Sequence, residues 1–168
     1  MSLKISELKT YKTINRKAKS GKYISIDFEF KYNPNVKKFN LRILSKLLDF
    51  LFYYGLFFLI SAYTDFNMHP VLLALLCLFL INPILETLTG RTFGKLLLGF
   101  EVIDDYCNKP SVLRSFAKNK LQFLNLIVYA ISEGTAWSED IYYHNEKTLT
   151  YTIWRKEKKT ILKMMQNE

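Results

Sequence analysis

The sequence predicts an α-helical membrane protein, built from a transmembrane helical hairpin, a third short membrane helix and a small cytoplasmic β-sheet. Two observations support this prediction. Apolar runs of seventeen and eighteen residues occupy positions 47–63 and 71–88, and the whole of 47–88 contains no Lys or Arg. As a helix, each run would be about 26 Å long, which is close to the hydrocarbon thickness of a bilayer.

Charge is distributed unevenly along the 168 residues. The net charge is +9 and the mean hydropathy is +0.01. Basic residues beside apolar spans are typical of juxtamembrane segments that set orientation and contact anionic lipids. We therefore expect a lipid bilayer and anionic lipid headgroups as partners, and no nucleic acid. The chain divides into a basic cytoplasmic N-terminal segment with one strand (1–40), a membrane domain (41–155) and a basic C-terminal tail (156–168).

The N-terminal segment contains one clear periodic pattern. Residues 1–22 are rich in Lys and lack periodicity, which predicts a loose or partly helical tail. Residues 24–32 alternate apolar and polar side chains, and this period of two predicts a half-buried strand. The Asn-Pro-Asn sequence at 33–35 ends it.

The first membrane helix carries a polar face. From its predicted start near residue 39, Arg42, Lys46, Asp49 and Tyr53 recur at helical spacing on one side. Asp49 lies about two turns deeper than Arg42. An acid at that depth is costly in lipid and normally faces protein or water together with a partner.

The second membrane helix carries a polar stripe that includes Asn82 and Glu86. The nearest cations by depth are Arg42 and Lys46, so we expect an ion-paired cluster joining them to Glu86 and Asp49. Two interpretations stay open: the cluster locks the hairpin together, or it forms a site for an ion or solute. The turn before this helix lacks Lys and Arg, which predicts an external turn and a cytoplasmic N-terminus.

A glycine-rich segment follows the hairpin, with Gly90, Gly94 and Gly99 allowing sharp turns or close backbone approach. Its spacing differs from that of a nucleotide-binding P-loop. The segment either turns the chain along the membrane surface or binds an anion. In the second case the candidate headgroup or anion contacts are Arg91, Thr92, Lys95, Arg114 and Lys118.

The third membrane helix is expected over 112–131. Its apolar run is only eleven residues, which is typical of a re-entrant, interfacial or buried helix. A full crossing would also place the basic tail outside, so we favour a helix that dips in and returns, with a span through Trp137 as the alternative. Strands at 100–104 and 148–154 would pair in a small cytoplasmic sheet, and 24–32 is a further candidate for it.

Several of these features together resemble the RDD family of small bacterial membrane proteins. The likeness covers about residues 40–155 and implies a multi-pass protein of the bacterial inner (plasma) membrane. A transport role has been supposed for the family, including sodium/proton exchange for some members. The matching positions are Arg42 and Asp49 in the first helix, the segment from Glu86 to Asp104, which is the most diagnostic, Arg114 and Asn119 downstream, and, more loosely, His144. The sequence departs from the family's pattern at Ser45, which replaces the usual Ala, at Lys118, which replaces an Arg, and at Asn145, which replaces an acid.

No catalytic arrangement emerges from the sequence. His69 and His144 are expected on opposite sides of the bilayer, and Cys77 and Cys107 form neither a CxxC pair nor a disulfide framework. We therefore expect no enzyme activity, no catalytic residue, no metal site and no cofactor.

Two functions are consistent with this pattern. The first is ion or solute transport through a charged cluster of Arg42, Asp49, Glu86 and Asp104 near the cytoplasmic face. Because two or three spans are too few to enclose a pathway, this function predicts a homo-oligomer or a membrane protein partner. The alternative is a non-transporting adaptor or scaffold that recruits a protein partner or anionic lipid.

Overall fold

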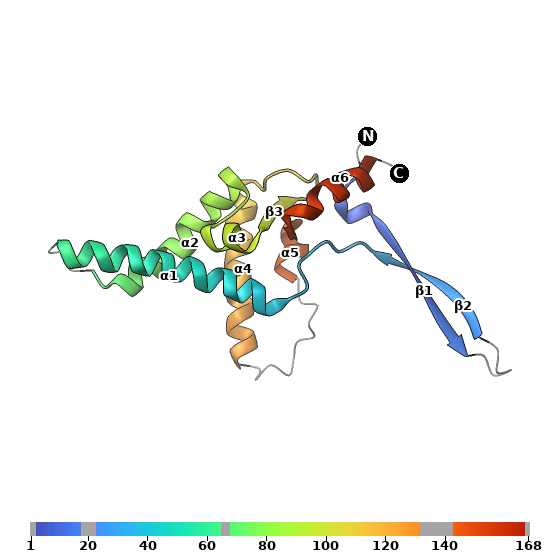
Figure 1. Cartoon of the computed structure of the whole chain (residues 1–168), viewed down its shortest axis with the longest axis horizontal. Helices are drawn as coiled ribbons and strands as arrows, with labels where there is room; N and C mark the ends of the chain where they lie inside the picture. The colour runs from blue at the N-terminus through green and yellow to red at the C-terminus, as the bar shows by residue number, and fades with distance from the viewer. Residues whose placement is uncertain (1–2, 18–22, 65–67, 132–142, 167–168) are drawn as a thin grey trace.

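The protein is elongated, with a helical hairpin at one end and a two-stranded ribbon at the other (Figure 1). Short helices and a second two-stranded sheet lie between these ends. This computed structural model describes residues 3–17, 23–64, 68–131 and 143–166.

The helical hairpin consists of α1 (Phe39–Tyr63) and α2 (Pro70–Thr89), as the two apolar runs predict. Pro70 occupies the first turn of α2, where its missing N–H is not needed. Gly90 ends α2 in the left-handed conformation, with φ of 77°, which glycine adopts without a steric penalty.

Most apolar side chains of the hairpin point outwards. Only 17% of the most apolar window of α1 and 22% of that of α2 are buried. The core helix of a soluble protein would be mostly buried, so this exposure distinguishes α1 and α2 from such helices. Within the described part of the chain, α1 and α2 are the two helices long and apolar enough to cross a membrane.

Two further helices pack against the base of the hairpin. The short α3 (Phe93–Leu98) contacts α1, and α4 (Val112–Ile131) contacts α2 and α5 (Tyr143–Thr148). The bounds of α4 agree with the prediction, and it runs steeply across the hairpin rather than along it (Figure 1). The alternative span through Trp137 falls outside the described residues.

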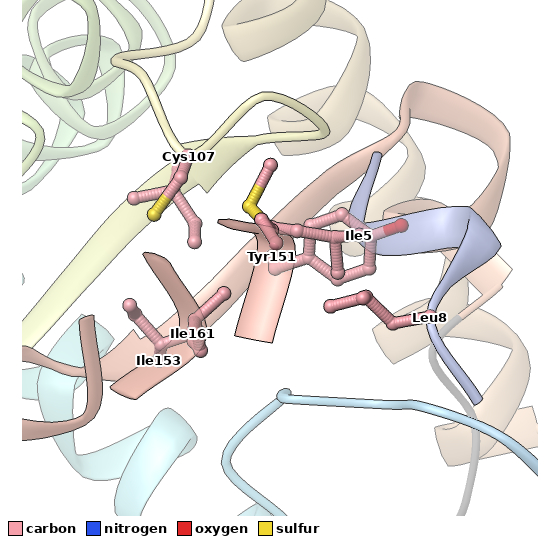
Figure 2. Packing of buried hydrophobic residues seen from close by; sticks show 8 residues of the cluster. Ile5, Leu8, Cys107, Tyr151, Ile153 and Ile161 are labelled. Atoms are coloured by element: carbon pink, nitrogen blue, oxygen red, sulfur yellow. The ribbon is translucent and has the colours of Figure 1, made fainter. Parts of the chain in front are cut away.

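The predicted pairing of the two C-terminal strands is confirmed. Strand β3 (Phe100–Asp104) pairs antiparallel with β4 (Thr150–Trp154), with Val102 opposite Thr152. The 3-10 helices η1 (Ile5–Glu7) and η2 (Arg155–Glu157) and the C-terminal helix α6 (Lys158–Gln166) complete this region. Figure 2 shows the apolar core that they enclose, made by Ile5, Leu8, Ile103, Cys107, Tyr151, Ile153, Ile161 and Met165.

Asn35 connects this sheet region to the start of α1. Its Oδ1 accepts hydrogen bonds from the Thr152 backbone N–H at 2.8 Å and from Asn145 Nδ2 at 2.6 Å. The backbone N–H of Val36 also donates to the Thr152 carbonyl at 2.8 Å. The chain therefore enters the hairpin from a fixed point on β4.

The N-terminal ribbon corrects two expectations. Residues 9–17, predicted to be a loose or partly helical tail, form strand β1 (Lys9–Lys17), which pairs antiparallel with β2 (Tyr23–Lys31). The second strand is largely exposed and does not join the β3–β4 sheet. Both differences have one cause: β2 finds its partner in the preceding segment, whose own pattern shows no strand periodicity.

Candidate functional site

A group of mostly buried polar residues, here called the polar cluster, fills the space where five helices meet at the base of the hairpin; Lys46 is partly exposed, and Gly94 contributes its backbone N–H. Asp49, Asn82 and Glu86 are 0% exposed within it. Its members are Arg42, Ser45, Lys46 and Asp49 from α1, Asn82 and Glu86 from α2, Gly94 and Lys95 from α3, Ser115, Lys118 and Asn119 from α4, and His144 from α5.

Asp49 holds the start of α3 against the hairpin. Its Oδ1 accepts a hydrogen bond from the Gly94 backbone N–H at 2.7 Å, and its Oδ2 accepts one from Asn82 Nδ2 at 3.1 Å. The Tyr53 hydroxyl donates to Asn82 Oδ1 at 2.8 Å. Hydrogen bonds to a carboxylate are among the stronger ones in proteins, so this chain of contacts fixes α1, α2 and α3 together.

Gly94 is required by the close approach of α1 and α3. A Cβ atom at this position would lie 1.9 Å from the Ser45 carbonyl oxygen, which belongs to the backbone of α1. Ser45 is small and buried, and its hydroxyl donates back to the Arg42 carbonyl at 3.0 Å. Thr92 begins α3 by accepting a hydrogen bond from the Lys95 N–H at 3.4 Å.

Glu86 joins three helices through its two carboxylate oxygens. Oε1 accepts from Lys95 Nζ, while Oε2 lies 3.3 Å from Lys118 Nζ and 3.4 Å from Asn119 Nδ2. Both lysines are buried with it. Burial removes these charges from water, so each depends on its partners to remain ionised.

Lys46 and Arg42 each contact a neutral side chain. Lys46 Nζ donates to Asn119 Oδ1 at 2.6 Å, and Arg42 Nη2 donates to His144 Nε2 at 3.0 Å. Burial and then the nearby Arg42 lower the pKa of His144, which keeps the imidazole neutral and able to accept this hydrogen bond. Burial likewise lowers the pKa of Lys118, against the opposing effect of Glu86.

Positive charge exceeds negative charge among the described members of the cluster. They include four basic side chains and two acidic ones, and each carboxylate oxygen of the acids accepts an N–H donor. Protonation or ion binding would therefore act on a connected network rather than on one side chain. No group of three or more His, Cys, Asp or Glu within the described ranges is placed to hold a metal ion.

The structure brings together three of the four residues predicted to form a charged cluster. Arg42, Asp49 and Glu86 all lie in it. Asp104 lies elsewhere, at the end of β3, where its Oδ1 accepts from the backbone N–H groups of Tyr106 at 3.0 Å and Asn108 at 2.8 Å and fixes a turn.

The predicted partners of Glu86 were wrong. Its ion pairs are with Lys95 and Lys118, not with Arg42 and Lys46. The reason is that α3 and α4 fold back over the end of α2, so cations distant in the sequence reach Glu86. Nothing in the helical periodicity of α1 and α2 reveals this fold-back. The only available signals were the lysine of the glycine-rich segment and the lysine before Asn119.

The candidate headgroup contacts are dispersed. Lys95 and Lys118 are buried with Glu86 rather than placed on the surface, and Thr92 caps α3. Arg91 lies 3.9 Å from Glu101 and Arg114 is partly exposed. The motif glycines serve the backbone: Gly90 and Gly99 end helices with φ of 77° and 74°, and Gly94 allows the contact with α1.

The contact between Arg42 and His144 was not expected from the sequence. The two residues are 102 positions apart, on the first and fifth helices. A loose likeness at His144 was the one signal that pointed to this position. Asn145 is also buried, and it ties α5 to Asn35.

Comparison with known proteins agrees with the resemblance seen in the sequence. The profile of the RDD family matches residues 36–141, which include α1 to α4 and every member of the polar cluster except His144. No match was found among curated proteins or among solved structures. The matched segment is more than half of the chain, and its lipid-facing helices fit an integral membrane protein. The chain belongs to the RDD family.

Proposed function

We propose that this protein is a multi-pass protein of a bacterial plasma membrane that transports an ion or solute by way of the polar cluster. One observation carries the proposal: Asp49 and Glu86 are fully buried on the two helices that have the composition of membrane spans. Ionisable side chains in such helices are costly, and they commonly mark ion or substrate pathways.

The charge distribution supports a cytoplasmic position for the polar cluster. Basic residues flank the base of the hairpin, whereas residues 47–88 contain none. Under the positive-inside rule, the base and the N-terminus face the cytoplasm and the turn between the helices faces outwards.

The bonding of the acids supports a proton or an anion over a sodium ion as the transported species. A metal cation would have to displace the N–H donors that already occupy Asp49 and Glu86. An anion would meet no such competition beside Lys46, whose Nζ contacts the neutral side chain of Asn119. A proton could leave or join the network at a buried lysine such as Lys118, whose pKa burial lowers.

Flux measurements in proteoliposomes test the proposal. We expect wild-type protein to move protons or chloride above the level of empty vesicles, and Asp49→Asn to reduce this flux at least tenfold. Asn keeps the shape of the side chain and an oxygen for the Gly94 N–H. Glu29→Gln, which removes an exposed acid from the ribbon, is the matched control and should retain full flux. Background flux from correctly folded wild-type protein would refute a transport role.

A further inference from the structure

The polarity of α4 is the reverse of that of a helix on the surface of a soluble protein, where the apolar side faces the protein. Ser115, Lys118 and Asn119 are buried on the side that faces the polar cluster, and Gln122 follows them at helical spacing. Over residues 112–124 the exposed side chains of α4, here called its outer face, are apolar with one exception. They are Val112, Leu113, Ala117, Lys120, Phe123 and Leu124.

The outer face of α4 differs from the exposed side of α6 in the same chain. Leu113 is 83% exposed and Leu124 is 54% exposed. In α6, Ile161 and Met165 are buried whereas Lys159 is exposed, which is the arrangement that water favours. Burying a lysine and exposing leucines is instead the arrangement that lipid favours, because an exposed charge is costly there and an exposed leucine is not.

Contacts with α2 make the outer face continuous with the apolar surface of the hairpin. The Thr87 hydroxyl donates to Ser115 Oγ at 3.2 Å, and the centroids of the Phe123 and Phe79 rings lie 4.9 Å apart. Phe79 lies about two helical turns from Thr87, in the direction of the turn that joins α1 to α2. Leu80, beside it in the chain, is 52% exposed. A bilayer that covers α2 at this depth therefore also reaches the outer face of α4.

The strands on either side of α4 argue against a crossing of the membrane by this helix. β3 precedes α4 and β4 follows it, and because the two strands pair, both lie on the same side of the bilayer. Only residues 132–142 separate α4 from α5, fewer than the roughly 20 that a helix needs to cross back. Figure 1 shows α4 running steeply across the base of the hairpin, which is the direction expected of a helix that lies along the membrane.

We propose that α4 lies along the membrane within the cytoplasmic leaflet, with lipid as the partner that covers its outer face. Lys120 is the single charged residue of that face. Its side chain is long enough to reach the headgroups while its stem contacts acyl chains, and its charge suits the anionic lipids of a cytoplasmic leaflet. The proposal needs the hairpin to be in the membrane but does not need transport, so it and the transport proposal can fail separately.

The short helix α3 shows the same reversal on the α1 side of the base. Lys95 is buried, whereas Leu96 is 55% exposed and Leu97 is 58% exposed. The Phe93 ring stacks on the ring of Phe52 in α1, with the two centroids 4.2 Å apart. Both long-range partners of the hairpin therefore turn lysine inwards and leucine outwards, and they separate the polar cluster from the surrounding lipid.

Spin labels on full-length protein in liposomes that contain anionic lipid test this position. Leu113→Cys and Leu124→Cys place labels at the two ends of the outer face. Leu162→Cys is the matched control, because Leu162 is an exposed leucine (39%) on α6. Collision with oxygen, which concentrates in lipid, relative to collision with a water-soluble nickel chelate should be roughly tenfold higher at both α4 sites than at the control. The labelled parent protein measures the background from Cys77 and Cys107.

The depths of the two labels distinguish a helix that lies along the membrane from one that crosses it. Eleven residues of helix span about 16 Å, so a crossing helix would place the labels at depths that differ by nearly that distance. We expect a difference of less than about 8 Å, with both labels near the boundary of headgroups and acyl chains. A difference near 16 Å would overturn the proposal. So would labels that meet the nickel chelate as freely as the control does, since water would then cover the face, or labels that meet neither reagent, since protein would then cover it.

Thiol labelling provides an independent measurement of the topology. Tyr106, which precedes α4, is 46% exposed, and Met164 on α6 is 40% exposed. The single variants Tyr106→Cys and Met164→Cys should both react with a membrane-impermeant maleimide in inside-out vesicles, and neither should react in intact cells. Reaction of either variant from the external side would overturn the proposal.

Discussion

The protein has two interiors with opposite chemistry. Beneath the β3–β4 sheet, Ile5, Ile103 and Ile153 pack in an apolar core like that of a soluble domain. At the base of the hairpin the buried side chains are polar or charged, as with Asp49 and Glu86, while leucines of the same helices point outwards.

This contrast indicates that the two regions meet different solvents. In water, folding buries apolar surface and leaves charges exposed. In lipid there is little to gain from burying leucine, but an exposed charge is costly, so polar groups collect where helices meet. The change from the polar cluster to the apolar core falls between α3 and β3, which follow each other directly in the chain.

The largest loss of stability is expected from Gly94→Ala. The new Cβ would overlap the Ser45 carbonyl oxygen, and backbone atoms cannot move aside as a flexible side chain can. Separating α1 from α3 would also break the hydrogen bond between Asp49 and the Gly94 N–H. We expect a loss of about 4 kcal/mol or more in the free energy of unfolding, measured in detergent micelles.

Gly55→Ala is the matched control, because a Cβ at Gly55 meets no heavy atom within 4 Å. In the middle of α1, alanine should increase stability by up to about 1 kcal/mol. If both glycine variants are equally stable, then α1 and α3 do not approach each other as closely as the structure shows.

The next largest loss of stability is expected from Glu86→Gln. This change leaves Lys95 and Lys118 buried without a negative partner, and such broken buried pairs lose about 3–5 kcal/mol. Glu29→Gln on the ribbon removes an exposed partner of Lys9 and should change stability by less than about 1 kcal/mol. Equal losses in the two variants would show that the polar cluster is open to water.

A pair of aliphatic truncations compares the two interiors directly. Ile153 is 0% exposed in the apolar core, whereas Leu59 on α1 is 57% exposed. Ile153→Ala should lose about 3 kcal/mol by removing buried methyl groups and leaving a cavity. Leu59→Ala exchanges one apolar surface in contact with lipid or detergent for a smaller one, so we expect a much smaller loss. A comparable loss at Leu59 would mean that α1 is buried against protein.

The hairpin could be predicted from local sequence because lipid requires an apolar composition of each membrane helix separately. Each span must be apolar over its own length, and the face carrying Arg42 and Asp49 repeats at helical spacing within α1. The β3–β4 pairing was predicted from two short stretches of strand-like composition, and the bounds of α4 from a basic pair at helical spacing followed by an apolar run.

Contacts between elements could not be predicted in this way. Lys118 is 32 residues from Glu86, and the steep path of α4 that brings them together is a property of packing, not of periodicity. The same applies to β1, whose strand conformation depends on pairing with β2. Asp104 was grouped with the acids because of its place in a motif, yet β3 carries it away from the hairpin to a turn.

The smallest expected effect concerns His144, where the polar cluster meets α5. Burial and the adjacent Arg42 lower its pKa in the folded protein, whereas the unfolded chain titrates near the ordinary value of about 6.5. Below that pH the unfolded state binds a proton that the folded state does not. His144 should therefore reduce the free energy of unfolding by about 1 kcal/mol between pH 6 and pH 5.

His144→Gln provides the control for this pH dependence, because glutamine offers an oxygen to Arg42 but does not titrate. Between pH 5 and 6, the slope of the free energy of unfolding against pH should correspond to about one proton fewer in the variant than in the wild-type protein. Other groups contribute to the slope in both proteins. Nitrogen NMR of the imidazole should show a neutral ring in the folded protein at pH 5. A charged ring at that pH would show that His144 does not accept the hydrogen bond from Arg42, because a protonated imidazole has no free acceptor nitrogen.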